Sequence, residues 1–121
     1  MAEHYDLGKN GESYALDYLT NSGYRILDTN WYHQKKELDI IAFQNNTVVI
    51  VEVKTRTYTI LEEPKEAVTK QKQRNIVRAA NAYVNKRGLD YEVRFDIIEV
   101  ICKGNNYKIS HIQDAFYPCL G

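Results

Sequence analysis

The chain has 121 residues and a mass of 14.1 kDa, which is the size of one small domain. Lysine and arginine total 16, aspartate and glutamate also total 16, and the pI is about 6.8. This balance argues against a protein that coats nucleic acid or an anionic membrane through its overall charge, although it leaves room for a local basic surface. We expect a single domain over residues 1–121.

The two cysteines, Cys102 and Cys119, are too few for a disulfide framework, and their spacing matches no zinc motif. The first residues are polar and acidic, so no signal peptide is expected. No apolar run approaches the length of a membrane span, which is about 20 residues. We therefore expect a soluble cytoplasmic protein that does not use a membrane.

The hydrophobic pattern predicts an α/β chain with a mixed sheet and the element order α-β-β-β-α-β-β. Gly23 is expected to end the first helix, because glycine accepts the left-handed conformation there. Pro64 suits a first helical turn, and Gly88 should end that second helix. The predicted elements are helix 5–22, strands 24–27, 37–43 and 47–56, helix 64–86, and strands 91–102 and 107–112.

Asn45 and Asn46 lie between two β-prone runs and predict a tight hairpin, because asparagine tolerates the positive φ angles of a two-residue primed turn. In such a hairpin, residues equidistant from the turn face each other, which puts Asp39 opposite Glu52. Strand alternation puts Lys54 on the same face as Glu52. The two carboxylates would then oppose each other with their Cβ atoms about 5 Å apart.

Opposed carboxylates beside apolar neighbours repel each other, so something should offset that repulsion. A divalent cation with oxygen ligands at about 2.1 Å would do so by bridging both groups. Lys54 could then orient or deprotonate an attacking water, or balance charge on a phosphate. These are the groups that metal-assisted phosphodiester hydrolysis needs. The alternative is a solvated Glu-x-Lys on an exposed strand, and a one-residue slip would move Asp39 to the other face.

A further acid, Glu12, lies on the first predicted helix in one row with Ala15 and Leu19. This row lies at the edge of the buried stripe, so we expect Glu12 to reach the strand end and complete the acidic cluster. The alternative is an acid that merely interacts favourably with the helix dipole.

Several short motifs follow one another along the chain: Gly11-Glu12 with Ala15 and Leu19, Gly23–Leu27, Glu37–Ala42, Val51–Arg56, Lys70–Ala80 and Arg94–Asp96. In this order and spacing they resemble the YraN-like family of small, uncharacterised bacterial proteins over roughly residues 8 to 100. Two residues depart from the pattern, namely Lys36, where the family usually has glycine, and Leu38, where the wider superfamily has proline.

That family is similar to the restriction-endonuclease-like PD-(D/E)xK superfamily, which includes Holliday junction resolvases. The resemblance implies a three-layer core and a nuclease site that binds Mg²⁺ (or Mn²⁺). Asp39 takes the position of the PD aspartate, Glu52 and Lys54 take the (D/E)xK positions, and Glu12 matches an acid that resolvases supply from the first helix. The Val53 carbonyl would join Asp39 and Glu52 in holding the metal, with Glu12 as an auxiliary ligand.

Basic residues are concentrated between positions 65 and 87, where seven stand against the single acid Glu66. Lys70, Arg74 and Arg78 recur every four residues and so form one helical stripe that could follow phosphates. The alternative is a solvated helix face opposite the core. The residues expected to contact nucleic acid are Lys36, Arg56, Lys70, Lys72, Arg74 and Arg78.

The sequence thus favours a metal-dependent nuclease acting on nucleic acid. The analogy with the resolvases favours DNA, branched DNA included, as the substrate, and the same analogy allows a homodimer. The alternatives are a non-catalytic nucleic-acid-binding or protein-binding module on the same scaffold and a purely structural acid cluster. Arg94 and Asp96 are expected to pair internally. All three histidines, including His111, are interpreted as surface or incidental residues.

Overall fold

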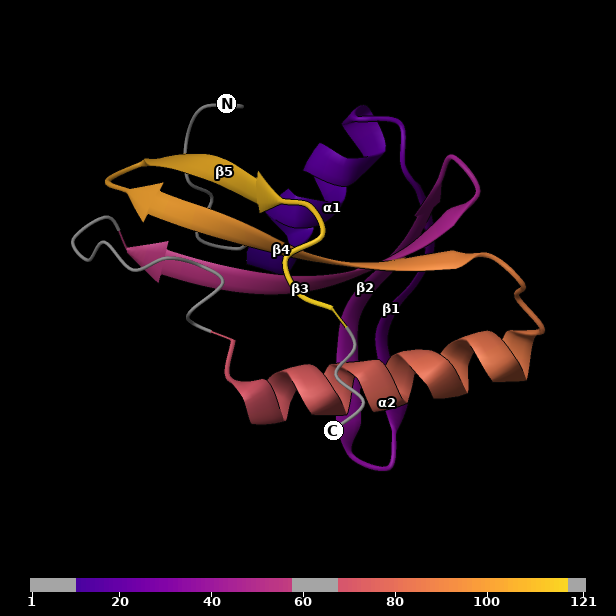
Figure 1. Ribbon diagram of the computed structural model, residues 1–121. Coiled ribbons are helices and arrows are strands. Elements are labelled where there is room, and N and C mark those ends of the chain that lie inside the picture. Colours follow the sequence, from indigo (N-terminus) through magenta and orange to yellow (C-terminus); the bar gives the residue numbers. More distant parts are fainter. Residues whose placement is uncertain (1–10, 58–67, 118–121) are drawn as a thin grey trace.

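The computed structural model describes residues 11–57 and 68–117, and its element order is the predicted one. A helix precedes a three-stranded antiparallel unit, and a second helix leads to a closing pair of strands (Figure 1). The elements are α1 (Gly11–Asn21), β1 (Arg25–His33), β2 (Lys36–Gln44), β3 (Thr47–Thr57), α2 (Lys70–Arg87), β4 (Glu92–Lys103) and β5 (Asn106–Ile112).

Two element boundaries differ from the prediction. β1 continues to His33, well past the expected end at residue 27, because it pairs with β2 along its whole length. The helix α2 begins at Lys70, after an extended Thr69 whose hydroxyl accepts the backbone N–H of Lys72 at 3.1 Å. The predicted helix start at residue 64 and the predicted first-helix residues 5–10 lie outside the described residues.

The five strands form one mixed sheet in the order β1-β2-β3-β4-β5, in which only β3 and β4 are parallel. The helices cover opposite faces of this sheet, so the fold has the three layers that were expected (Figure 1). On one face, Tyr14, Ala15 and Leu19 of α1 pack over buried valines and isoleucines. On the other, α2 buries the row Ile76, Ala79, Ala80 and Tyr83.

The turn between β2 and β3 has the predicted conformation and sets the predicted register. Asn45 and Asn46 have φ angles of 53° and 57°, as a primed two-residue turn requires. Residues then pair from Gln44 with Thr47 to Ile40 with Val51. The alternation that this register imposes places the side chains of Val48 and Ile50 in the core on the α2 side.

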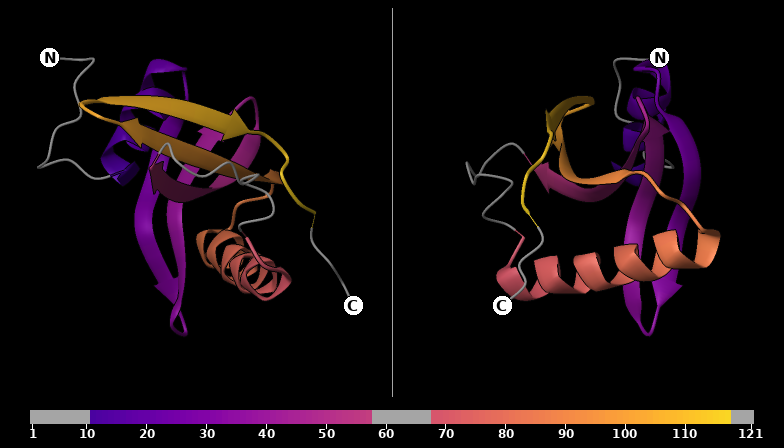
Figure 2. Two further views of the ribbon diagram at one scale, coloured as in Figure 1. Left: turned by 90° about the vertical axis from the view of Figure 1, so that its left-hand side faces the viewer. Right: turned by 45° about the vertical axis from the view of Figure 1, so that its right-hand side comes forward.

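β2 and β3 separate directly after the Ile40–Val51 pair, and this separation creates the candidate site. Beyond that point β2 continues with β1 alone, as far as Lys36 opposite His33, while β3 continues with β4 as far as Thr57. Figure 2 shows the β1–β2 hairpin projecting away from the plane of β3 and β4. In the part of the chain that the structure describes, neither helix is long and apolar enough to cross a lipid bilayer.

Candidate active site at the fork between β2 and β3

Asp39 is the first β2 residue beyond the paired region. Its side chain takes the place of a backbone hydrogen bond that the separated strands do not form. The next hydrogen-bonded pair of this ladder would have been Leu38 with Val53, but β2 has turned away from β3 there. The Val53 backbone N–H instead donates to the Asp39 carboxylate, Oδ2, at 2.9 Å. Asp39 is thereby fixed at the fork by the backbone of β3.

Glu52 lies next to Asp39, as the hairpin register predicted. The strand ladder ends one pair short of these two residues, and the negative charge of Asp39 acts on the Glu52 carboxyl group there. The residue Glu52 is only 5% exposed, at the end of the row formed by Val48 and Ile50. Two like charges in such a place repel each other, which favours a proton on one of the two carboxyl groups.

The electrostatics of the pair follow from burial and like charge. Burial, with the nearby negative charge of Asp39, raises the pKa of Glu52 to about 7, although Lys72 and Lys54 act in the opposite direction. Burial also raises the pKa of Asp39, although the Val53 N–H favours its ionised form. The pair therefore keeps a proton to a higher pH than two separate, solvated carboxyl groups would.

Two lysines affect the ionisation of Glu52, and only one of them, Lys54, is expected at the site from the sequence. Lys54 follows two positions along β3, and its charge favours the ionised form of Glu52. Lys72 of α2 forms an ion pair with Glu52, with 3.2 Å between Nζ and Oε2. The sequence predicts Lys72 to be one of the residues that contact nucleic acid. Helical periodicity puts Lys72 in one row with the buried residues Ile76 and Ala80, but it does not show which acid of the sheet Lys72 meets.

Glu12 is brought to the rim of the site but does not contact Asp39 directly. The N-terminus of α1 lies against β3, where a side chain on Gly11 would collide with the Thr55 hydroxyl.

Asn30 of β1 donates to Glu12 Oε2 at 3.2 Å and to Glu37 Oε2 at 3.0 Å. Burial, with a smaller effect of Asp39, raises the pKa of Glu12 against the opposing hydrogen bond from Asn30. Asn30 lies beyond Leu27, where the sequence predicts the strand to end, so it is not among the expected site residues.

The donors at the fork have the chemistry that a hard divalent cation requires. Asp39 and Glu52 supply carboxylate oxygens. The Val53 carbonyl points toward the same side as the Val53 N–H, because both groups of a strand residue face one neighbour. Within residues 11–57 and 68–117, no three His, Cys, Asp or Glu side chains converge closely enough to hold a metal ion. The structure therefore offers two carboxylates and a carbonyl, which suits a Mg²⁺ or Mn²⁺ ion that keeps several waters.

The predicted basic stripe lies on the far side of α2 from these carboxylates. Lys70, Arg74 and Arg78 are opposite the buried row of the helix, so they face away from the sheet. Arg74 donates to Gln71 at 2.9 Å. A nucleic acid that touches both this stripe and the fork would have to pass around the helix.

The two remaining residues expected to contact nucleic acid lie elsewhere on the sheet. Arg56 forms an ion pair with the buried Glu99, with 3.0 Å between Nε and Oε2. Lys36 lies beside the tip of the β1–β2 hairpin, opposite His33. Of the six basic residues, Lys72 is therefore the one in direct contact with the candidate site.

A family model described as "Uncharacterised protein family UPF0102" matches residues 11–100. The chain belongs to this family. UPF0102 proteins of Bacteroides thetaiotaomicron and Flavobacterium psychrophilum are 51% and 50% identical to it over 120 and 117 residues. These matches cover 99% and 97% of this chain, and 99% and 98% of the two relatives. The family resemblance inferred from the sequence is confirmed, and the matched range includes every residue at the fork.

A second group of ionisable residues lies on the α1 side of β4, outside the fork. Asp96 is fully buried and accepts hydrogen bonds from Arg94 at 2.8 and 2.9 Å, which confirms their expected internal pairing. The Asp114 backbone N–H adds a further bond at 3.0 Å. His111 contacts Asp96 through Nε2 at 2.8 Å and the Tyr18 hydroxyl through Nδ1 at 2.9 Å. The interpretation of His111 as incidental was therefore wrong.

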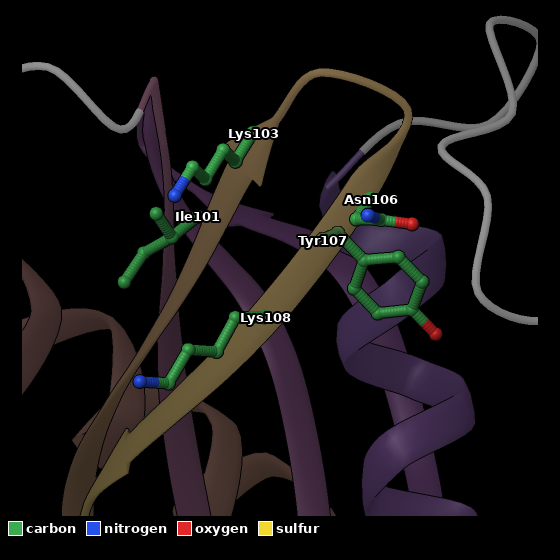
Figure 3. A pocket seen from close by; sticks show the side chains of 5 residues that line it. All are labelled: Ile101, Lys103, Asn106, Tyr107 and Lys108. Carbon is green, nitrogen blue, oxygen red and sulfur yellow. The ribbon is translucent and has the colours of Figure 1, made fainter.

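A cavity of about 310 Å³ lies away from the carboxylates, at the tip of the β4–β5 hairpin (Figure 3). Ile101, Lys103 and Lys108 extend to one side of this hairpin, whereas Tyr107 points toward α1. The Tyr107 ring packs on that of Tyr14, with 3.9 Å between the ring centroids. The cavity contains no carboxyl group and adds nothing to the chemistry of the fork.

Proposed function

We propose that the protein is a metal-dependent nuclease that hydrolyses phosphodiester bonds in nucleic acid, most simply DNA. The observation that carries the proposal is the position of Asp39 beside the buried Glu52, at the point where β2 leaves β3. Forcing two acids together in a partly buried place is unfavourable, and it becomes favourable when a divalent cation joins them. The resemblance of the sequence to the PD-(D/E)xK nucleases supports the same assignment.

Each residue at the fork has a distinct part in the proposed reaction. Asp39 and Glu52, with the Val53 carbonyl, would hold Mg²⁺ or Mn²⁺, which would supply Lewis-acid stabilisation of the phosphate charge. Lys54 orients the attacking water or takes its proton. Glu12 acts from the rim, through Asn30, on the position of the acidic cluster. Hydrolysis then transfers the water oxygen to phosphorus and releases a sugar hydroxyl.

The test is cleavage of branched, single-stranded and duplex DNA by the purified protein in Mg²⁺ or Mn²⁺. We expect cleavage that chelation abolishes and that Asp39→Asn and Lys54→Ala each reduce at least about 100-fold, the loss expected when one catalytic group is removed. Asn81→Ala is the control, because Asn81 is an exposed, uncharged residue of α2 that is not among the expected contacts of nucleic acid. Absence of cleavage, or equal cleavage by Asp39→Asn, would contradict the proposal.

The same experiment distinguishes the non-catalytic alternative. A binding module that merely keeps the scaffold would retain DNA binding in chelator, would not respond to Glu52→Ala, and would lose affinity when basic residues are removed. A purely structural acid cluster would give neither cleavage nor binding that depends on the fork.

A further inference from the structure

Lys72 is the residue of the site whose position the proposed hydrolysis does not explain. Its ammonium group lies 3.2 Å from Glu52 Oε2. The Glu52 side chain is 6% exposed, whereas that of Lys72 is 48% exposed. The ion pair therefore joins a fixed, buried acid to a cation that still reaches solvent.

The position of Lys72 on α2 allows it to leave Glu52 without disturbing the core. It lies in the first turn of the helix, one turn before Ile76, which anchors the helix on the sheet. A lysine side chain is a flexible stem that carries a compact point charge, so it can swing between partners. Lys54, in contrast, extends from a strand that stays paired with β4 on both sides of it.

A divalent cation and the Lys72 ammonium group would compete for the same carboxylate. Both stabilise the ionised form of Glu52, and they repel each other at close range. A cation held by Asp39 and Glu52 would therefore displace Lys72 outward. The open side of the fork is also where the phosphate of a bound nucleic acid must approach, and an ammonium group there would gain a charge-assisted hydrogen bond.

We propose that Lys72 is a displaceable counter-ion of Glu52, which a divalent cation releases to bind the phosphate of the substrate. Lys72 thus couples metal binding to nucleic-acid binding and is a positioning residue for the substrate. This inference rests on the proposed nuclease function. It adds that the affinity for nucleic acid contributed by Lys72 exists only when a cation is bound.

The test compares the wild type with Lys72→Met, using a labelled oligonucleotide whose binding is measured in chelator and in Ca²⁺, a hard cation that takes the same oxygen ligands. We expect Lys72→Met to weaken binding about five- to tenfold in Ca²⁺, as loss of one charged phosphate contact should, and less than about twofold in chelator. Lys70→Met is the matched control, because Lys70 faces away from the fork. It should cause the same small loss in both conditions.

A second measurement needs no nucleic acid. Calorimetric titration with Mn²⁺ should show that Lys72→Met binds the cation about threefold or more tightly than the wild type, because a competing charge is gone. Lys72→Arg should retain the wild-type competition, which excludes an effect of altered packing alone. Melting curves show whether each variant is folded.

The outcomes separate this inference from the function on which it rests. Equal or weaker Mn²⁺ binding by a folded Lys72→Met, or an oligonucleotide affinity that it lowers equally with and without Ca²⁺, would overturn the counter-ion role. If the wild type neither binds Mn²⁺ nor cleaves DNA, the proposed function itself fails. If the wild type cleaves DNA and Lys72→Met behaves like Lys70→Met, only the counter-ion role fails.

Discussion

Two buried carboxylate centres lie in the same sheet and are built in opposite ways. Asp96 is enclosed by donors, because Arg94, His111 and the Asp114 N–H all bond to it. These hydrogen bonds lower the pKa of Asp96, although burial alone would raise it. Asp39 and Glu52 face each other instead, and their burial raises the pKa of both.

Asp96 is therefore a carboxylate that stabilises the fold, whereas the burial of Asp39 beside Glu52 is unfavourable for the fold. A buried charge that is fully hydrogen-bonded is costly to remove, since its partners would be left unpaired. A pair of buried acids is unfavourable as it stands and becomes favourable only with a proton or a cation. Strain of this kind, at the end of a paired region, is characteristic of functional sites rather than of structural ones.

The largest change in stability is expected at Asp96, the carboxylate that is enclosed by hydrogen-bond donors. Asp96→Asn should lower the free energy of unfolding by about 3 to 5 kcal/mol, because Arg94 and His111 would keep buried donors without their charged acceptor. Urea unfolding measures this loss. Asp114→Asn is the control, since the Asp114 side chain is exposed and only its backbone contacts Asp96. A loss below about 1 kcal/mol for Asp96→Asn would show that the two centres do not differ as described.

At the fork we expect a smaller change in the free energy of unfolding, and there the substitution should stabilise the protein. The pKa of Glu52 is raised from 4.5 to about 7, so the native state binds more protons than the unfolded state between these values. Stability should therefore fall as the pH rises through this window, and the loss should be complete above it. Glu52→Gln should remove part of this loss and stabilise the protein by about 1 kcal/mol at pH 8, with little gain at pH 4.

Unfolding of wild type and Glu52→Gln at the two pH values provides the measurement. Glu99→Gln is a matched control, because Glu99 is also a buried glutamate but is paired with Arg56 rather than with another acid. It should destabilise the protein. Stability of the wild type that increases from pH 5 to pH 8, after correction with Glu52→Gln, would show that Glu52 is not held in its protonated form.

The sequence predicted local geometry well, because the signals concerned are local. The Asn45-Asn46 turn and strand alternation were enough to bring Asp39 and Glu52 together. The length of β1 was missed, because Asp28 and Asn30 are residue types that are rare in strands and the strand has a bulge after Ile26.

Long-range contacts were the part that the sequence could not supply. His111 meets Asp96 only because β5 folds back on β4, and the two residues are 15 positions apart. Lys72 meets Glu52 only because α2 packs across β3. Lys54 and Lys72 are both visible as charges in the sequence. Which residue of the sheet a helix side chain meets depends on how the buried face of the helix packs, and the sequence alone does not show that packing.

Melting the protein with and without Mn²⁺ at pH 7.5 is the most direct test of a cation site at Asp39 and Glu52. A ligand at ten times its dissociation constant should raise the melting temperature of the wild type by about 3 to 6 °C. We expect this rise for the wild type and for Arg78→Ala, and none for Glu52→Gln. No rise in the wild type, or an equal rise in Glu52→Gln, would contradict it.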